Sequence, residues 1–276
     1  MKEKLFTKNF TLLILGQLTS LFGNFILKLA LSMYVLEVTG SAAIFAGILS
    51  AATIPTILLS PLGGILADRA DRRNIMVALD ALTGVSVLCA ALFLSESNAI
   101  AVISTLLIIL SILGAFETPT VQACIPTMLQ GDNIMKGNAV VNQVASLSYL
   151  IAPMLGGVLY AMLGLKPVMY ASVVCFFITA LFECFIKLSY QRIQNQGGVL
   201  QIVKQDFLSS MQYITKEQTS ISKMLLLTAL SRFFVMGITI VGLPFLVRTI
   251  LGFNAKYYGA AESTLAVATI LGSIAA

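Results

Sequence analysis

The sequence predicts an all-α, polytopic membrane protein, and two observations predict it: the composition and the length of the apolar segments. Hydrophobic residues make up 58% of the 276 residues and charged residues only 11%, with a mean hydropathy of +0.94. A soluble domain carries about 25% charged residues. The apolar segments continue for roughly 20 residues, the length of a helix that crosses a bilayer. Hydrocarbon permits only helices or closed barrels, and the short alternating segments of a barrel are absent from the sequence.

Eight segments have the length and composition of spanning helices: 10–36, 42–66, 74–95, 99–122, 138–163, 167–188, 222–247 and 257–276. Glycine, proline and charged residues separate them. The gap at 189–221 is longer and polar, and within it residues 200–214 have the apolar spacing of an amphipathic interfacial helix. The predicted organisation is a six-helix N-terminal half (1–188), a cytoplasmic linker (189–221) and the start of a C-terminal half (222–276).

The distribution of basic residues predicts the orientation. Of 17 Lys and Arg residues, twelve lie on the side of the membrane that holds the N terminus, three lie on the other side, and two lie within spans. Cytoplasmic loops carry the excess of Lys and Arg, so the N terminus is predicted to be cytoplasmic. Because the basic residues sit between apolar spans, the net charge of +5 does not indicate a nucleic-acid partner.

Composition also argues against several kinds of chemistry. The chain has no His, so no imidazole can serve as a proton shuttle or metal ligand. Its four cysteines lie in or at the ends of apolar spans without the spacing of ligands. No nucleotide-binding glycine loop or nucleophile triad is present. We therefore expect no enzymatic activity, no metal and no cofactor.

A charged loop with a glycine pair joins the second and third spans, over residues 61–73. The glycines, Gly63 and Gly64, let helix backbones approach closely. Asp68 can accept hydrogen bonds from a neighbouring helix N-terminus, and the arginines can bridge to carboxylates of adjacent helices. Such charge pairs would form a latch that a rocking motion breaks and re-forms. The residues predicted for this gating loop are Gly64, Asp68, Arg69, Arg72 and Arg73.

This loop resembles the signature of the major facilitator superfamily, G-x-L-a-D-r-x-g-r-r, with Asp71 where the pattern prefers glycine. Residues 16–23, 38–42 and 116–119 resemble the macrolide-efflux-type drug:proton antiporters of that superfamily. The resemblance implies two six-helix halves that carry a small molecule by alternating access. It also implies that this chain is a fragment of a twelve-helix protein, truncated after about eight helices, whose missing C-terminal helices complete it. A genuine eight-helix protein is the alternative.

Two stretches bear on export. Pro153, Gly156 and Gly157 in the fifth span resemble the end of the antiporter motif G-P-x-x-G-G and predict a kink or a close helix crossing, although ordinary bundle packing would use the same residues. Related exporters often carry an arginine in the fourth span where this chain has Leu110 and Ser111. The resemblance associates that arginine with proton coupling, so this chain departs from the family at that position.

Ionisable and polar residues inside the spans are candidate functional residues, because charges at bilayer depth are costly. One polar stripe recurs at helical spacing along the first span, and together with Arg232 of the seventh it is predicted to line a cavity, with a polar seam between helices as the alternative. The cavity candidates are Gln17, Ser20, Asn24, Lys28, Ser32 and Arg232. Asp80 and Glu117, with Glu183, lie nearer the inner ends of their spans and are interpreted as latch carboxylates or as side chains that reach water.

The leading hypothesis is secondary active, proton-coupled efflux of small amphipathic compounds across a bacterial plasma membrane. Its partners are the small-molecule substrate, protons and the lipid bilayer. The alternatives are export or flipping of an endogenous anionic molecule, such as a siderophore or a lysophospholipid, and a truncated, transport-incompetent fragment.

Overall fold

A computed structural model describes residues 5–188, residue 212 and residues 219–275. The described chain is helical, with short connections. Its elements are α1 (Lys8–Thr39), α2 (Ala42–Arg69), α3 (Arg72–Phe93), α4 (Ala99–Met128), α5 (Asp132–Leu163), α6 (Leu165–Cys184), α8 (Thr219–Gly237), η2 (Ile238–Gly242), α9 (Leu243–Phe245), η3 (Leu246–Ile250) and α10 (Ala255–Ala275). The predicted amphipathic helix at 200–214 and nearly all of the predicted linker lie outside the described residues.

Each of the eight predicted spans corresponds to helix, and the all-α prediction is confirmed. Seven stretches are long and apolar enough to cross a membrane, namely α1 to α6 and residues Ser220–Ile250, which join α8, η2, α9 and η3. The eighth predicted span coincides with α10, which is not among those seven. The chain is therefore a multi-pass membrane protein, and short turns join its first six spans, α1 to α6.

The connection between α4 and α5 is shorter than predicted. The predicted spans 99–122 and 138–163 leave a connection over 123–137, but α4 continues to Met128 and α5 begins at Asp132. Gly131, with φ of +55°, makes the reversal in three residues. The predicted length of this connection was wrong because both helices continue beyond their apolar segments. Polar residues interrupt the hydropathy pattern, but they do not have to end the helix.

Local signals fix the ends of several helices. The Thr7 hydroxyl accepts a hydrogen bond from the Phe10 backbone N–H (3.3 Å) at the start of α1, and Ser41 caps α2 in the same way. Gly40 ends α1 in the left-handed conformation, with φ of +58°. Asp71 accepts the backbone N–H groups of Arg73 and Asn74 at the start of α3.

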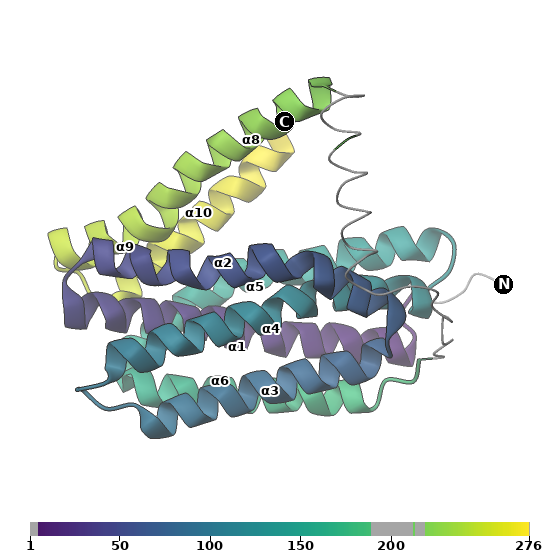
Figure 1. Cartoon of the computed structure of the whole chain (residues 1–276), viewed down its shortest axis with the longest axis horizontal. Helices are drawn as coiled ribbons and strands as arrows, with labels where there is room; N and C mark the ends of the chain where they lie inside the picture. Colours follow the sequence, from purple (N-terminus) through teal and green to yellow (C-terminus); the bar gives the residue numbers. More distant parts are fainter. Residues whose placement is uncertain (1–4, 189–211, 213–218, 276) are drawn as a thin grey trace.

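Helices α1 to α6 form one bundle, which we call the N-terminal bundle (Figure 1). Within it α2 packs on α4, α3 packs on α4 and α6, and α1 packs on α5 and α6. Helix α10 packs on α5, whereas α8 and α10 run obliquely to the bundle, which they meet near α9 (Figure 1). We call the end of the bundle that holds the Gly40 and Gly164 turns the outer end, and the end that holds residues 69–72 and 129–131 the inner end.

Candidate functional site

A buried polar layer crosses the N-terminal bundle between two apolar clusters. On α1 the inner cluster contains Phe10 and Leu13, and the outer cluster begins at Leu27. On α3 the corresponding residues are Met76 and Val87. The polar layer lies between them and receives buried side chains from three helices, Gln17 and Ser20 (α1), Asp80 (α3) and Glu183 (α6), and the half-buried Glu117 from α4.

Ser20 joins two carboxyl groups from different helices. Its Oγ lies 3.0 Å from Asp80 Oδ1 and 3.3 Å from Glu117 Oε1. Ser20 and Asp80 are 1% and 2% exposed, so the contact is out of reach of bulk water in this conformation. A buried polar group normally requires a hydrogen-bond partner. Ser20 supplies that partner to both carboxyl groups and thereby ties α1 to α3 and α4.

Glu183 adds a third carboxyl group to the polar layer. It is 1% exposed, both of its carboxyl oxygens lack a hydrogen-bond partner, and it interacts electrostatically with Asp80 and Glu117. On the other side, the Lys28 ammonium interacts electrostatically with Glu117. The three carboxyl groups therefore act on one another, and Lys28 acts on one of them, Glu117.

The stripe predicted on α1 is divided between two environments. Gln17 and Ser20 are buried in the polar layer, Asn24 and Ser32 are half-buried, and Lys28 is exposed. The stripe therefore runs from the bundle interior to a surface that the described helices leave open. Arg232 is exposed on α8. Whether these residues line a substrate cavity stays a prediction.

The gating-loop residues occupy the end of α2 and the start of α3. A Cβ added to Gly63 would collide with the backbone carbonyl of Ala115 and lie 3.1 Å from the Cα of Phe116, whereas Gly64 has nothing within 4 Å. The close approach of α2 to α4 therefore depends on Gly63, and the assignment of such a role to Gly64 was wrong. Asp68 belongs to the last turn of α2, but its side chain lies outside the described residues.

Among the described residues, Arg72 and Arg73 of that loop do not make the contacts with carboxylates of adjacent helices that the predicted latch requires. Arg73 donates to the Cys184 backbone carbonyl (2.5 Å), which ties α3 to the end of α6. Neither Arg72 nor Arg73 forms an ion pair with Asp80 or Glu117 in the described part of the chain. Arg69 ends α2. A latch between these carboxylates and the loop stays a prediction for another conformation.

The motif on α5 makes two close helix crossings. A Cβ on Gly156 would lie 3.1 Å from the Cα of Ile26, and one on Gly157 would lie 2.5 Å from the Ala255 carbonyl oxygen. Gly259 of α10 in turn meets the Pro153 carbonyl. The small residues thus bring α5 against α1 on one side and α10 on the other, while α5 continues unbroken through Pro153.

Ser111 is one of the two residues, with Leu110, at which the sequence comparison predicts the arginine position of related exporters. Its hydroxyl is hydrogen-bonded to the Thr56 hydroxyl and donates to the Ala52 carbonyl of α2. The side chain therefore serves as a polar link between α2 and α4.

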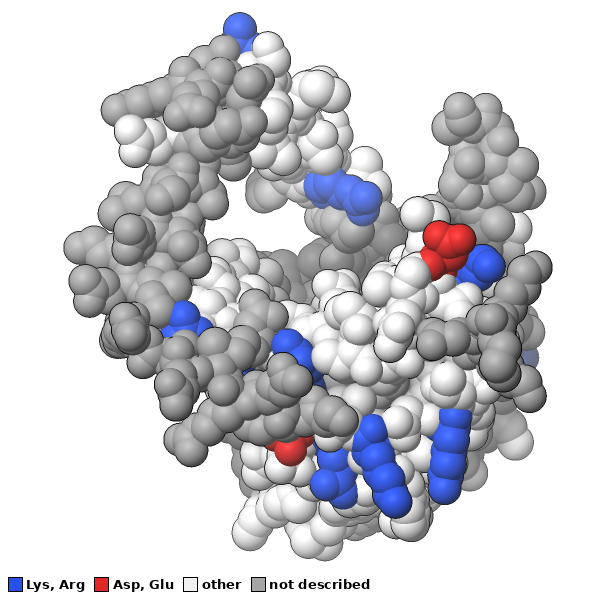
Figure 2. Space-filling view, turned by 90° about the vertical axis from the view of Figure 1, so that its right-hand side faces the viewer, with Lys and Arg blue, Asp and Glu red and all other residues white. Residues whose placement is uncertain are grey.

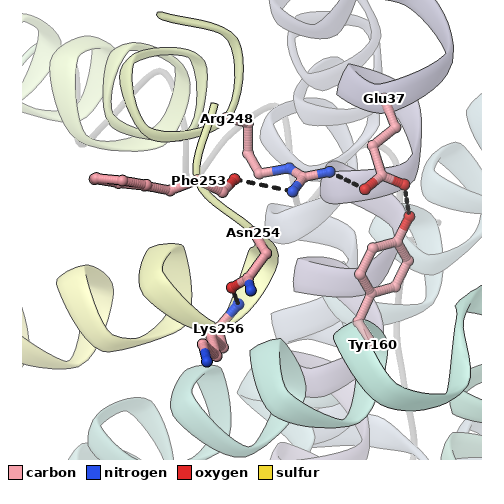
Figure 3. Close-up of polar contacts among 6 residues, drawn as sticks. All are labelled: Glu37, Tyr160, Arg248, Phe253, Asn254 and Lys256. Carbon is pink, nitrogen blue, oxygen red and sulfur yellow. Dashed lines mark hydrogen bonds and ion pairs between the residues drawn. The ribbon is translucent and has the colours of Figure 1, made fainter. Parts of the chain in front are cut away.

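A second polar group, at the outer end, was not predicted from the sequence (Figure 3). Arg248 at the end of the seventh span forms an ion pair with Glu37 of α1 and donates to the Phe253 carbonyl (2.9 Å). The Tyr160 hydroxyl of α5 donates to the same carboxylate. We call Glu37, Tyr160 and Arg248 the outer clasp. The sequence signal that could have indicated this contact is that Glu37 and Arg248 lie at the outer ends of the first and seventh spans.

The fold and these sites define a polytopic membrane protein in which the six-helix N-terminal bundle meets a second set of helices, α8 to α10, at one end. The pattern of the Major Facilitator Superfamily matches residues 13–276, and the chain belongs to that superfamily.

Curated relatives carry transport names. The chain is 29% identical to macrolide efflux protein A of Streptococcus pyogenes over 199 residues, which are 71% of this chain and 48% of the relative. It is 30% identical to the multidrug efflux pump Tap of Mycolicibacterium fortuitum (55% of this chain, 39% of the relative) and 26% identical to the staphyloferrin A transporter of Staphylococcus aureus (58% and 41%). The chain spans about half the length of the curated relatives it matches.

Proposed function

We propose that this chain forms the N-terminal half and part of the C-terminal half of a secondary active transporter. It exports small amphipathic compounds across a bacterial plasma membrane by alternating access, with its N terminus in the cytoplasm. Proton flow drives the export, and the carboxyl groups of the polar layer carry the protons. The names of the curated relatives, two of which are drug efflux proteins, support the direction and the class of cargo.

The observation that carries the proposal is the contact of one hydroxyl with two carboxyl groups. Ser20 Oγ is within hydrogen-bond distance of both Asp80 and Glu117. A serine hydroxyl has one hydrogen, so it can donate to only one of them. If both contacts are hydrogen bonds, the other carboxyl group must be protonated and donate to Ser20. The geometry therefore supports a proton held within the layer.

The surroundings of the layer suit a group that exchanges protons in only one conformation. Carboxylates that share a site disfavour one another's ionisation, and charges at bilayer depth are costly. Lys28 offers an opposite charge close to Glu117, and it stands where the α1 stripe reaches an open surface. A substrate that engages the Glu117 carboxylate would compete with a proton for that group, and this competition would couple export of the cargo to inward proton flow.

The arrangement of helices supports an inward-open conformation. The outer clasp joins α1 and α5 to the end of the seventh span, and α5 packs against α10 through glycines. From that junction α8 and α10 diverge from the bundle (Figure 1). With the N terminus cytoplasmic, the closed end is extracellular, and opening the clasp would be part of the outward transition.

The test is efflux of a fluorescent compound panel from a drug-sensitive bacterium that expresses the protein, with and without a proton uncoupler. We expect efflux that the uncoupler abolishes and that Asp68→Asn weakens. Efflux that persists in the uncoupler would refute proton coupling. A well-expressed protein that exports no compound in the panel would refute drug export.

An endogenous anionic cargo, such as a siderophore or a lysophospholipid, is the second candidate. Lys28 and Arg232 are both exposed, and two cations facing one cavity would suit an anion. One curated relative is named a staphyloferrin A transporter, which agrees with this class. Lys28→Gln would lower export of anionic compounds while sparing cationic ones if the cargo is anionic. The opposite selectivity would exclude this candidate.

A further inference from the structure

A basic pocket lies at the inner end of the N-terminal bundle, apart from the polar layer. It has a volume of about 500 Å³ and is formed by the start of α1, the α2–α3 connection and the residues that follow α6. Its basic residues are Lys8, Arg73 and Lys187. Figure 2 views the molecule from this end and shows that Lys and Arg side chains gather there, with few acidic side chains among them.

The single carboxylate of the pocket is already occupied. Asp71 Oδ1 accepts the backbone N–H groups of Arg73 (3.1 Å) and Asn74 (3.4 Å), and its Oδ2 accepts the Asn74 side-chain amide (3.0 Å). It forms no ion pair with Lys8 or Lys187 in the described part of the chain. Arg73 also keeps its Nε buried without a hydrogen-bond partner. The pocket thus has three basic side chains against one carboxylate, and its net charge is positive.

The pocket wall is held by a pair of hydrogen bonds. The Asn9 side-chain amide donates to the Lys187 carbonyl (2.7 Å), and Asn9 Oδ1 accepts the Lys187 backbone N–H (3.1 Å). Together with the bond from Arg73 to Cys184, these contacts fix the start of α1 and the end of α6 to the start of α3. The three basic residues are therefore anchored on elements tied to one another.

The apolar residues of the pocket distinguish its ligand from a free anion. Phe185 lines the pocket and is 58% exposed directly after α6 ends, and Ile186 next to it packs into the inner apolar cluster. A site lined both by basic side chains and by an exposed aromatic ring matches a molecule with an anionic head and an apolar tail. Basic pockets between spanning helices on the cytoplasmic side bind the head groups of anionic lipids.

We infer that this pocket binds the phosphate head group of an anionic glycerophospholipid, of the phosphatidylglycerol or cardiolipin type. Lys8, Arg73 and Lys187 hold the phosphate oxygens, and an acyl chain lies along Phe185. The bound lipid would join α1, α3 and α6 where they leave the bilayer. The site is separate from the polar layer and does not depend on the transported compound.

The test measures lipid binding to the purified protein by native mass spectrometry. Wild type, the double variant Lys8→Gln/Lys187→Gln and the control Lys136→Gln are titrated with phosphatidylglycerol and with zwitterionic phosphatidylcholine. Lys136 is exposed at the start of α5 and does not line the pocket. Arg73 is left unchanged because it also anchors α6.

We expect phosphatidylglycerol to bind wild type and the control alike, and to bind the double variant more weakly by about fivefold for each lysine removed. Lys8→Arg/Lys187→Arg should retain phosphatidylglycerol binding. This result would show that the loss of positive charge, not altered folding, weakens binding in the double variant. Equal binding of phosphatidylglycerol to all variants, or equal binding of phosphatidylcholine, would overturn the inference. Displacement of the lipid by millimolar inorganic phosphate would assign the pocket to a soluble phosphate and overturn the lipid assignment.

Discussion

Glu37, near the end of α1, and Arg248, at the end of the seventh span, form an ion pair although 211 residues separate them in sequence. The pair joins the N-terminal bundle to the second set of helices at the outer end, and Tyr160 supports the carboxylate from α5. A contact of this kind closes the outer end and still allows the two sets of helices to separate. Its partial exposure means that it can be broken at modest cost.

Breaking the ion pair should favour opening of the outer end. The Glu37 side chain is 41% exposed, and exposed pairs contribute roughly 0.2–1 kcal/mol, so Glu37→Gln should shift the open-to-closed ratio by about 1.4- to fivefold. Spin labels on the outer ends of α1 and the seventh span would report the distance distribution. The charge reversal Glu37→Arg/Arg248→Glu should restore the closed population, and failure of the reversal to do so would show that the pair does not control closure.

Removal of the Ser20 hydroxyl should destabilise the bundle. Ser20→Ala leaves both Asp80 and Glu117 without that partner in a buried layer, which costs about 1–3 kcal/mol in the free energy of unfolding. Ser86→Ala is the matched control because its hydroxyl bonds only to Leu82 of its own helix. Thermal unfolding in detergent checks the difference, and equal loss in the two variants would contradict the assigned contact.

Two adjacent glycines on α2 should differ sharply in their tolerance of alanine. Gly63→Ala forces the added methyl group against the α4 backbone at Ala115, and such overpacking costs about 1–3 kcal/mol. Gly64→Ala meets open space and should be neutral or stabilising by up to about 1 kcal/mol, because alanine favours helix. The two melting temperatures in detergent measure this contrast. Similar melting temperatures of the two variants would contradict the orientation of α2 in which Gly63, and not Gly64, faces α4.

A methyl group on Gly157 should separate α5 from α10. The added Cβ would lie 2.5 Å from the Ala255 carbonyl oxygen, a backbone atom that cannot move without shifting its helix. A cysteine placed at Ala255, which is 1% exposed, should react faster with a thiol reagent in the Gly157→Ala background. Gly114→Ala, with no neighbour within 4 Å, is the control and should leave the labelling rate unchanged.

The positions of the spans followed from hydropathy because each helix must satisfy its own backbone in hydrocarbon. The rotation of each helix about its own axis could not be predicted from hydropathy. The sequence predicts close helix packing at both Gly63 and Gly64, yet only Gly63 faces α4. The weak amphipathicity of lipid-embedded helices explains this, since an apolar residue is equally suited to lipid and to a neighbouring helix.

The sequence identified the candidate residues individually, but only the packing of the helices shows which of them lie together. Asp80, Glu117 and Glu183 were predicted to pair with arginines or to reach water because each lies near an inner helix end. The structure brings all three toward α1, where Ser20 contacts two of them. Which helices surround α1 is set by the tertiary arrangement, and spacing along single helices contains no information about it.

The central claim is that the carboxyl groups of the polar layer carry the protons that drive export. The most direct measurement is uncoupler-sensitive efflux in Asp80→Asn, Glu117→Gln and Glu183→Gln, beside Ser86→Ala as the control, in cells with matched amounts of folded protein. The account predicts that at least one amide variant loses the uncoupler-sensitive part of efflux while the control retains it. Full uncoupler-sensitive efflux in all three amide variants would contradict the account.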